Sequence, residues 1–222
     1  MNAMEPEFPT YRIGLVEDHL EMARAALHGF FQPYPELRLV ADGHTVAELL
    51  SVTTELDLVI LDLQGLPDKS TPKKNIRALK DAGIANVLVY TSRDRRYLVQ
   101  EAAKAGVLGV ITKTEPAGKL VEAVRLAVTG QAAPSVDWAA ALDADAELIP
   151  QLTERERKVL AMYASGDTAI DIATELHLAP DTIRKYVAKI KDKYTEAGFE
   201  VRKKGDLAAR ARVDGYFQDW DG

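Results

Sequence analysis

The first 130 residues alternate short apolar runs with longer segments whose apolar positions repeat at helical spacing. The runs are rich in Val, Ile and Leu, and three are nearly continuous, as in strands buried on both faces of a parallel sheet. We predict strands at 11–16, 37–42, 56–61, 86–90 and 109–112, and helices at about 20–31, 45–54, 72–82, 95–105 and 115–129. Five strand–helix units in succession indicate an α/β doubly wound domain around a five-stranded parallel sheet.

The pattern changes after residue 130. Residues 131–150 are acidic and Ala-rich, which indicates a linker or a short helix around Trp138. From Leu152 onward the apolar spacing is helical throughout, with no strand pattern. The sequence therefore predicts an α/β domain at 9–130, an acidic linker at 131–150 and a small all-α domain at 151–222.

The all-α part has the pattern of a helix-turn-helix. Thr153 followed by Glu156 is a capping box before the first helix, and a tight turn separates a short second helix from a third that opens at Pro180. On a helical wheel the third helix has an apolar face and an opposite, mainly cationic face. The apolar face carries Ile183, Val187, Ile190 and Tyr194, and the opposite face carries Arg184, Lys185, Ala188 and Lys189. Amphipathicity alone indicates no more than a surface helix.

Composition limits the class of protein. The chain of 222 residues is 47% hydrophobic and 28% charged, as in globular proteins, and the absence of cysteine excludes disulfides and thiolate metal sites. The first residues contain two early glutamates and no apolar segment of a secretory signal. No apolar stretch approaches the ~18 residues that a membrane span needs. We therefore expect a cytoplasmic protein with no membrane partner.

Charge is distributed unevenly along the chain. The formal net charge is -6, yet residues 184–204 contain eight bases against three acids. A local basic segment on a neutral or acidic background is compatible with phosphate binding, although a solvated helix face is the commoner explanation.

Polar residues follow the predicted strands at their carboxyl ends, where open parallel sheets bind ligands. They are Glu17 and Asp18 after the first strand, Asp62 after the third, Thr91 and Ser92 after the fourth, and Lys113 after the fifth. Singly, each could be a helix cap, a turn residue or a surface residue. Together, three carboxylates would raise one another's pKa values, and a hard cation such as Mg²⁺ would relieve that repulsion. In such a site Asp62 could act as a nucleophile toward a phosphoryl donor.

The segments LVEDH, VILDL, LVYTS and VITK occur in the order found in receiver domains of two-component response regulators, which residues 11–130 resemble. The resemblance implies a flavodoxin-like fold and an Mg²⁺ site made by Glu17, Asp18, Asp62 and the backbone carbonyl of Gln64. It also implies that Asp62 takes a phosphoryl group from a sensor histidine kinase, with Thr91 and Lys113 contacting the phosphoryl oxygens.

The segments LTERERKVL, IATEL and DTIRKYVAKI are similar to the LuxR/NarL-type helix-turn-helix DNA-binding domain, over about residues 150–217. The resemblance implies that Arg184, Lys185 and Lys189 touch double-stranded DNA and that Thr182 lies near a phosphate. The basic loop at 202–204 could add phosphate contacts. The last helix, at about 206–217, would form a homodimer in the active state.

Three functional hypotheses remain. The first is a DNA-binding response regulator whose dimerisation and control of transcription depend on phosphorylation of Asp62. The second is an orphan regulator that binds DNA without phosphorylation, because the loop after Asp62 is unusual and Val110 stands where receiver domains commonly have an aromatic residue. The third is a phosphohydrolase, which we rank below both because Gln64 occupies the position of the expected second aspartate. We therefore do not expect an enzyme.

Overall fold

The computed structural model describes residues 9–92, 96–133, 135 and 149–216. The chain divides into two compact units, the first built around a sheet and the second containing the helices from residue 154 onward. Residues 136–148, which contain most of the predicted linker and the predicted helix around Trp138, lie outside the described residues. The boundaries at 130 and 150 therefore stay predictions.

Five parallel strands form the sheet of the first unit, in the spatial order β2-β1-β3-β4-β5. They are β1 (Tyr11–Val16), β2 (Leu37–Gly43), β3 (Leu58–Leu61), β4 (Val87–Thr91) and β5 (Gly109–Thr112). Each agrees with a predicted strand to within two residues at either end. The sequential order reverses beside β1, so that β1 and β3 lie side by side at the switch point where such sheets bind ligands.

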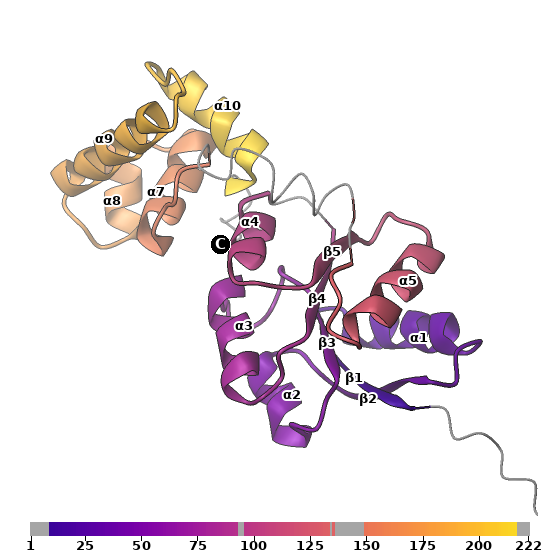
Figure 1. Ribbon diagram of the computed structural model, residues 1–222. Coiled ribbons are helices and arrows are strands. Elements are labelled where there is room, and N and C mark those ends of the chain that lie inside the picture. Colours follow the sequence, from indigo (N-terminus) through magenta and orange to yellow (C-terminus); the bar gives the residue numbers. More distant parts are fainter. Residues whose placement is uncertain (1–8, 93–95, 134, 136–148, 217–222) are drawn as a thin grey trace, which may run out of the picture. The chain divides into compact units, whose positions relative to one another are not determined.

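Helices cover both faces of this sheet, as Figure 1 shows. They are α1 (Leu20–Phe31), α2 (Val46–Val52), α3 (Pro72–Asp81), α4 (Arg96–Lys104) and α5 (Ala117–Ala127). In Figure 1, α1 and α5 lie on one face and α2, α3 and α4 on the other. The doubly wound fold predicted from the strand–helix alternation is therefore confirmed.

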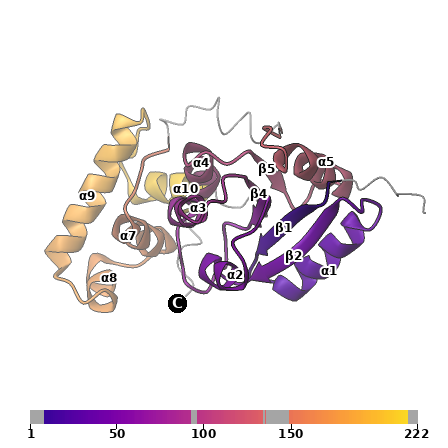
Figure 2. The same cartoon turned by 60° about the horizontal axis from the view of Figure 1, so that its bottom comes forward.

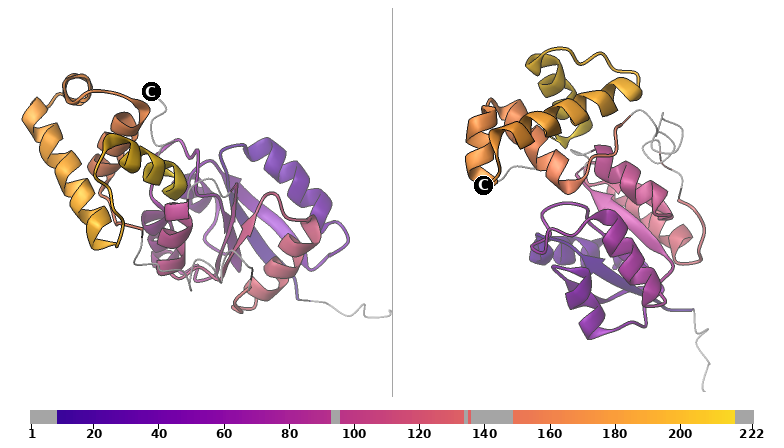
Figure 3. Two further views of the ribbon diagram at one scale, coloured as in Figure 1. Left: turned by 90° about the horizontal axis from the view of Figure 1, so that it is seen from above. Right: turned by 90° about the vertical axis from the view of Figure 1, so that its left-hand side faces the viewer.

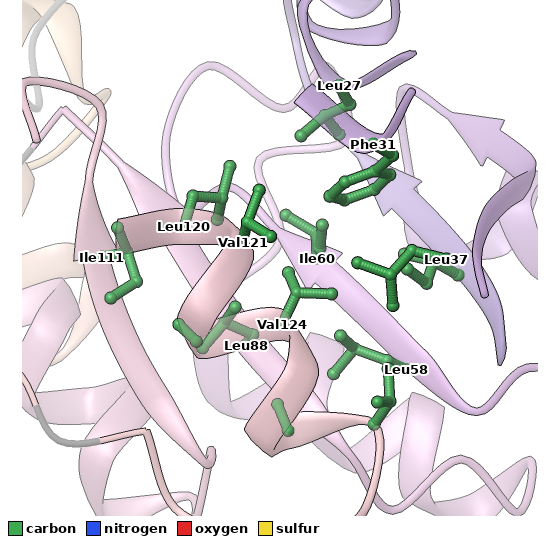
Figure 4. Close-up of a cluster of buried hydrophobic side chains, with 14 of the residues drawn as sticks. Leu27, Phe31, Leu37, Leu58, Ile60, Leu88, Ile111, Leu120, Val121 and Val124 are labelled. Carbon is green, nitrogen blue, oxygen red and sulfur yellow. The ribbon is translucent and has the colours of Figure 1, made fainter. Parts of the chain in front are cut away.

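A buried apolar cluster fixes α1 and α5 on the sheet. Figure 4 shows Leu27 and Phe31 of α1 and Val124 of α5 pointing toward Ile60 and Leu88 of the central strands. These side chains are at most 5% exposed. Burying one such side chain contributes about 1.5–3 kcal/mol, so the cluster holds the sheet edge that carries the polar residues in a fixed geometry.

Within residues 149–216 the second unit contains four helices and no strand. They are α7 (Glu154–Ser165), α8 (Ala169–Glu175), α9 (Pro180–Glu196) and α10 (Lys204–Asp214). Figure 3 shows α8 and α9 joined by a short turn, with α9 crossing α7. The predicted helix-turn-helix is therefore present as α8, the turn and α9.

Capping explains where these helices begin. Thr153 and Glu156 form the predicted capping box at the start of α7, each side chain accepting the other's backbone N–H. At α9 the N-cap is Ala179, which offers no side-chain acceptor. The last helix, predicted at about 206–217, ends at Asp214, because Gly215 adopts a left-handed φ of 85° that terminates it.

Of the helices that the structure describes, none combines the length and the hydrophobicity that a bilayer crossing requires.

Candidate functional site

Three carboxylates gather at the carboxyl edge of the sheet of the first unit. Val16 and Leu61 are register partners on β1 and β3, so the next residue of each strand, Glu17 and Asp62, emerges at the same level. Asp18 follows Glu17, and ligand oxygens of Glu17, Asp18 and Asp62 all lie within 4.8 Å of one another. The predicted convergence of these three residues is observed.

Lys113 reaches the same point from the end of β5. Its Nζ donates to Asp62 Oδ2 at 2.5 Å and to Glu17 Oε1 at 2.7 Å. Its own backbone N–H donates to the carbonyl of Thr91 at 2.9 Å, which anchors the residue to β4. One ammonium therefore bridges two carboxylates that are only 1% and 3% exposed.

The positive charge that Lys113 supplies does not balance the carboxylates of this cluster. Burial, together with the neighbouring Asp18 and Asp62 carboxyls, raises the pKa of Glu17 to about 8, and contacts with Lys113 only partly oppose this rise. Burial alone would lower the pKa of Lys113, but attraction to Asp62 and the hydrogen bonds it makes raise it above its usual value. The site therefore favours a further cation.

The donor set fits a hard divalent cation. Oε2 of Glu17 is buried and has no hydrogen-bond partner in the part of the chain that the structure describes, although a buried carboxylate oxygen normally has one. Glu17, Asp18 and Asp62 offer only oxygen ligands, the type that Mg²⁺ prefers. These residues could therefore hold Mg²⁺.

The loop after β3 shapes the same pocket. The backbone N–H groups of Leu63 and Gln64 donate to Asp62 Oδ1 at 2.6 and 3.3 Å, which orients that carboxylate. The predicted role of the Gln64 carbonyl as a metal ligand stays a prediction. Gly65, which the sequence analysis missed, adopts a φ of 69° and passes directly against Asp18. The Gln64-Gly65 pair, close behind Asp62, is the sequence feature that could have predicted this turn.

Thr91 and two neighbouring residues complete the edge. Thr91 is 1% exposed, and its Oγ1 has no hydrogen-bond partner in the structure. The Lys113 Nζ lies 5.9 Å from the centroid of the half-buried Tyr90 ring, a cation–π contact that the sequence analysis did not predict. Val110 is fully buried on β5. Thr91 therefore presents a buried hydroxyl that has no hydrogen-bond partner among the described residues.

The second candidate surface is the outer face of α9. Ile183, Val187, Ile190 and Tyr194 are buried, as the helical wheel predicted. Arg184, Lys185 and Lys189 are exposed, and Thr182 is half-buried beside them at the start of the helix. Figure 2 shows α9 lying along the outside of its unit. The four residues predicted to touch DNA therefore lie on or next to one exposed helix face.

Several cations that could contact DNA have partners within the second unit. Arg184 forms an ion pair with Asp181, and Lys189 forms one with Glu156 at 3.1 Å. Lys204, from the basic loop considered above as an additional phosphate contact, donates instead to the carbonyls of Gly166 and Asp167, both at 2.8 Å. Lys204 therefore supplies hydrogen bonds to the backbone carbonyls that follow α7.

A family model matches part of the second unit. Residues 150–195 match the family model described as bacterial regulatory proteins, luxR family. This match contains α7, α8 and most of α9, the helices that form the helix-turn-helix.

Two relatives are similar over most of the chain. The transcriptional regulatory protein DesR of Bacillus subtilis (strain 168) is 28% identical over 208 residues, which span 93% of this chain and 98% of DesR. The response regulator protein VraR of Staphylococcus aureus (strain NCTC 8325 / PS 47) is 30% identical over 190 residues, 83% of this chain and 90% of VraR.

Solved structures agree with these relatives. The RcsB response regulator of Salmonella typhimurium shares the fold with a TM-score of 0.62 at 16% identity, over 93% of this chain and 99% of RcsB. A LuxR-family two-component response regulator from Aurantimonas sp. SI85-9A1 is 28% identical with a TM-score of 0.53, over 60% of this chain and 96% of its own. The sheet with its acidic edge, the helix-turn-helix and the extent of the match to VraR lead to one assignment: the chain belongs to the two-component response regulators with a receiver domain and a LuxR-type helix-turn-helix domain.

Proposed function

We propose that this response regulator is controlled by phosphorylation of Asp62 and regulates transcription as a DNA-bound homodimer. The observation that carries the proposal is the meeting of Asp62, Glu17, Asp18 and Lys113 at one point of the sheet edge, where Asp62 and Glu17 are buried. A structural role explains these residues poorly, because burying Glu17 and Asp62 beside the partly exposed Asp18, with one ammonium between them, costs stability. A site that gains a cation and a phosphoryl group explains them better.

The reaction that these residues support is phosphoryl transfer to a carboxylate. An oxygen of Asp62 attacks the phosphorus of a phosphohistidine on a sensor histidine kinase, and the bond from phosphorus to the imidazole nitrogen breaks. The imidazole leaves with the electron pair, and Asp62 carries an acyl phosphate. Lys113 and the Thr91 hydroxyl are the groups of this chain available to contact the phosphoryl oxygens.

Mg²⁺ would be held by Glu17, Asp18 and Asp62, with the Gln64 carbonyl proposed as a further ligand, and when bound it would neutralise charge on the phosphoryl oxygens. The chain itself contributes orientation. Backbone N–H groups fix Asp62 Oδ1, and Lys113 lies against Oδ2. Both oxygens of the acceptor are thus oriented in the structure.

The proposed DNA contacts lie on the outer face of α9. Arg184 and Lys185 carry exposed cations there, and Thr182 is placed to reach a phosphate. A helix presenting such side chains fits the major groove, and pairing of two chains would place two such helices one DNA turn apart. Lys189 lies on the same face but is held by Glu156. We place this function in the cytoplasm, where DNA and kinase are both accessible.

Phosphorylation can be tested directly on the full chain. Incubation with acetyl phosphate and Mg²⁺ should give a hydroxylamine-labile adduct by intact-mass spectrometry, and Asp62→Asn should abolish it. Asp81→Asn removes an exposed carboxylate on α3 and is the matched control, which should react as the unaltered protein does. An adduct that persists in Asp62→Asn, or no adduct at all, would contradict the proposed phosphoacceptor.

The alternative is an orphan regulator that binds DNA without phosphorylation. The buried Val110 favours it, because this position has no large ring that could move when Thr91 engages a phosphoryl group. Sedimentation velocity and DNA anisotropy with and without beryllofluoride separate the two. Equal affinity and equal mass in both conditions would support the orphan regulator, and a shift in either would support phosphorylation control.

A further inference from the structure

Glu156 is a fully buried carboxylate that holds two lysines of α9. Its Oε1 lies 3.1 Å from Nζ of Lys189, and its Oε2 lies 2.6 Å from Nζ of Lys193. The same Oε2 accepts the backbone N–H of Thr153 at 2.7 Å, as part of the capping box of α7. One side chain therefore joins the start of α7 to two positions one turn apart on α9.

This carboxylate stays charged at every physiological pH. Burial raises the pKa of Glu156, but the contacts from Lys193, the Thr153 N–H and Lys189 outweigh burial and bring the pKa down to about 2. A buried charge deprived of a partner costs several kcal/mol or shifts its protonation. The Lys189 side chain is itself 61% exposed, so its ion pair differs from a pair of exposed side chains only in the burial of Glu156, which is 0% exposed.

The other cations of the outer face differ in this respect. Arg184 pairs with Asp181, and both side chains are more than 60% exposed, so this pair is screened by water and exchanges partners at little cost. Within residues 149–216 Lys185 forms no ion pair. Three neighbouring cations thus fall into three classes: one unpaired, one weakly paired, and one paired to a buried carboxylate.

We infer that Glu156 is a positioning residue that neutralises Lys189. Lys189 then orients α9, and Lys185 makes the phosphate contact that releases counterions from the DNA at this part of the helix. The inference rests on the proposed DNA-binding function and makes it more specific. Each phosphate neutralised by a protein cation releases counterions and adds about one unit to the slope of log K against log salt concentration. A lysine already neutralised within the protein adds little.

The test measures salt slopes for the full chain on a fluorescein-labelled mixed-sequence DNA duplex over a series of KCl concentrations. Lys185→Ala should lower the slope by about one, and Lys189→Ala should lower it by less than half as much. In the Glu156→Gln background Lys189 is released, and Lys189→Ala should then lower the slope by about one. A structural role of Glu156 alone would leave the effect of Lys189→Ala unchanged between the two backgrounds.

The outcomes separate the inference from the function on which it rests. Equal losses of slope for Lys185→Ala and Lys189→Ala in the unaltered background would overturn the neutralisation of Lys189 while leaving DNA binding intact. An unaltered protein that fails to bind the duplex at low salt would overturn the proposed function and the inference with it. If Glu156→Gln does not fold, as judged by circular dichroism, the comparison of the two single lysine variants decides.

Discussion

Gly65 approaches Asp18 so closely that a Cβ added to the glycine would lie 2.0 Å from Oδ2 of the carboxylate. The backbone of Gly65 also has a φ of 69°, a left-handed conformation that side chains disfavour. Two independent constraints therefore require glycine at this point of the loop, and only one of them concerns the acidic site.

A pair of glycine variants separates these constraints. Gly83 has a φ of 89° but no heavy atom within 4 Å of an added Cβ. We expect Gly65→Ala and Gly83→Ala each to lower the free energy of unfolding by about 1–2 kcal/mol through backbone strain. Only Gly65→Ala should also weaken Mg²⁺-dependent adduct formation at Asp62, because it displaces Asp18. Equal adduct yields in the two variants would argue against crowding of the acidic site.

Removal of Lys113 should destabilise the metal-free protein. Lys113→Met leaves Glu17 and Asp62 buried without their shared ammonium, and we expect the free energy of unfolding to fall by about 1–3 kcal/mol at neutral pH. Mg²⁺ should restore part of this loss, because it supplies positive charge to the same carboxylates. Urea unfolding in EDTA and in excess Mg²⁺ measures both effects. Lys119→Met, an exposed lysine on α5, is the control and should change neither.

The pH dependence of stability should reveal the raised pKa of Glu17. In the metal-free folded protein this pKa is about 8, above the ordinary value of 4.5, so the folded state binds the proton more tightly than the unfolded state does. The contribution of Glu17 to stability is therefore fully present below pH 4.5 and is lost as the pH rises to about 8. Urea unfolding in EDTA across this range should show the decline, and Glu17→Gln should flatten it. A decline of the same size in Glu17→Gln would assign it to another group.

Loss of the Tyr194 hydroxyl should destabilise the second unit. Tyr194 is fully buried and donates to Oδ2 of the equally buried Asp214 at 2.9 Å, while Arg210 contacts Oδ1 at 2.7 Å. Tyr194→Phe leaves one oxygen of a buried carboxylate without its donor, which should cost about 1–3 kcal/mol in thermal or urea unfolding. Tyr186→Phe, a half-buried position of the same helix, should cost less than half of that.

A better N-cap should stabilise α9. Ala179 occupies the N-cap with extended backbone angles and no side-chain hydrogen bond. Ala179→Ser keeps those angles accessible and adds an acceptor for a free N–H of the first turn, so we expect about 1 kcal/mol of added stability in urea unfolding. Ala197→Ser, at the other end of the same helix, should give no gain. No stabilisation by Ala179→Ser would mean that water already satisfies that turn.

The sequence by itself determined the elements and the two-part architecture. Buried parallel strands must be continuously apolar, so runs such as 58–61 were recognisable without tertiary information. Capping chemistry is equally local, and Thr153 with Glu156 predicted the start of α7 correctly. The convergence of Glu17, Asp62 and Lys113 was predictable as well, because the carboxyl ends of parallel strands share one edge of the sheet.

Only the tertiary structure decided how individual side chains are used. The second role of Glu156 depends on the crossing of α7 and α9, which no spacing along the chain specifies, so a capping residue proved also to be the partner of Lys189 and Lys193. Lys204 was recognised as basic, but its position against the end of α7 follows from the fold of the loop before α10. The close approach of Gly65 to Asp18 likewise joins two loops that are distant in sequence. Local periodicity fixes secondary structure, whereas ion pairing between elements depends on packing at a scale of a few ångströms that the pattern does not encode.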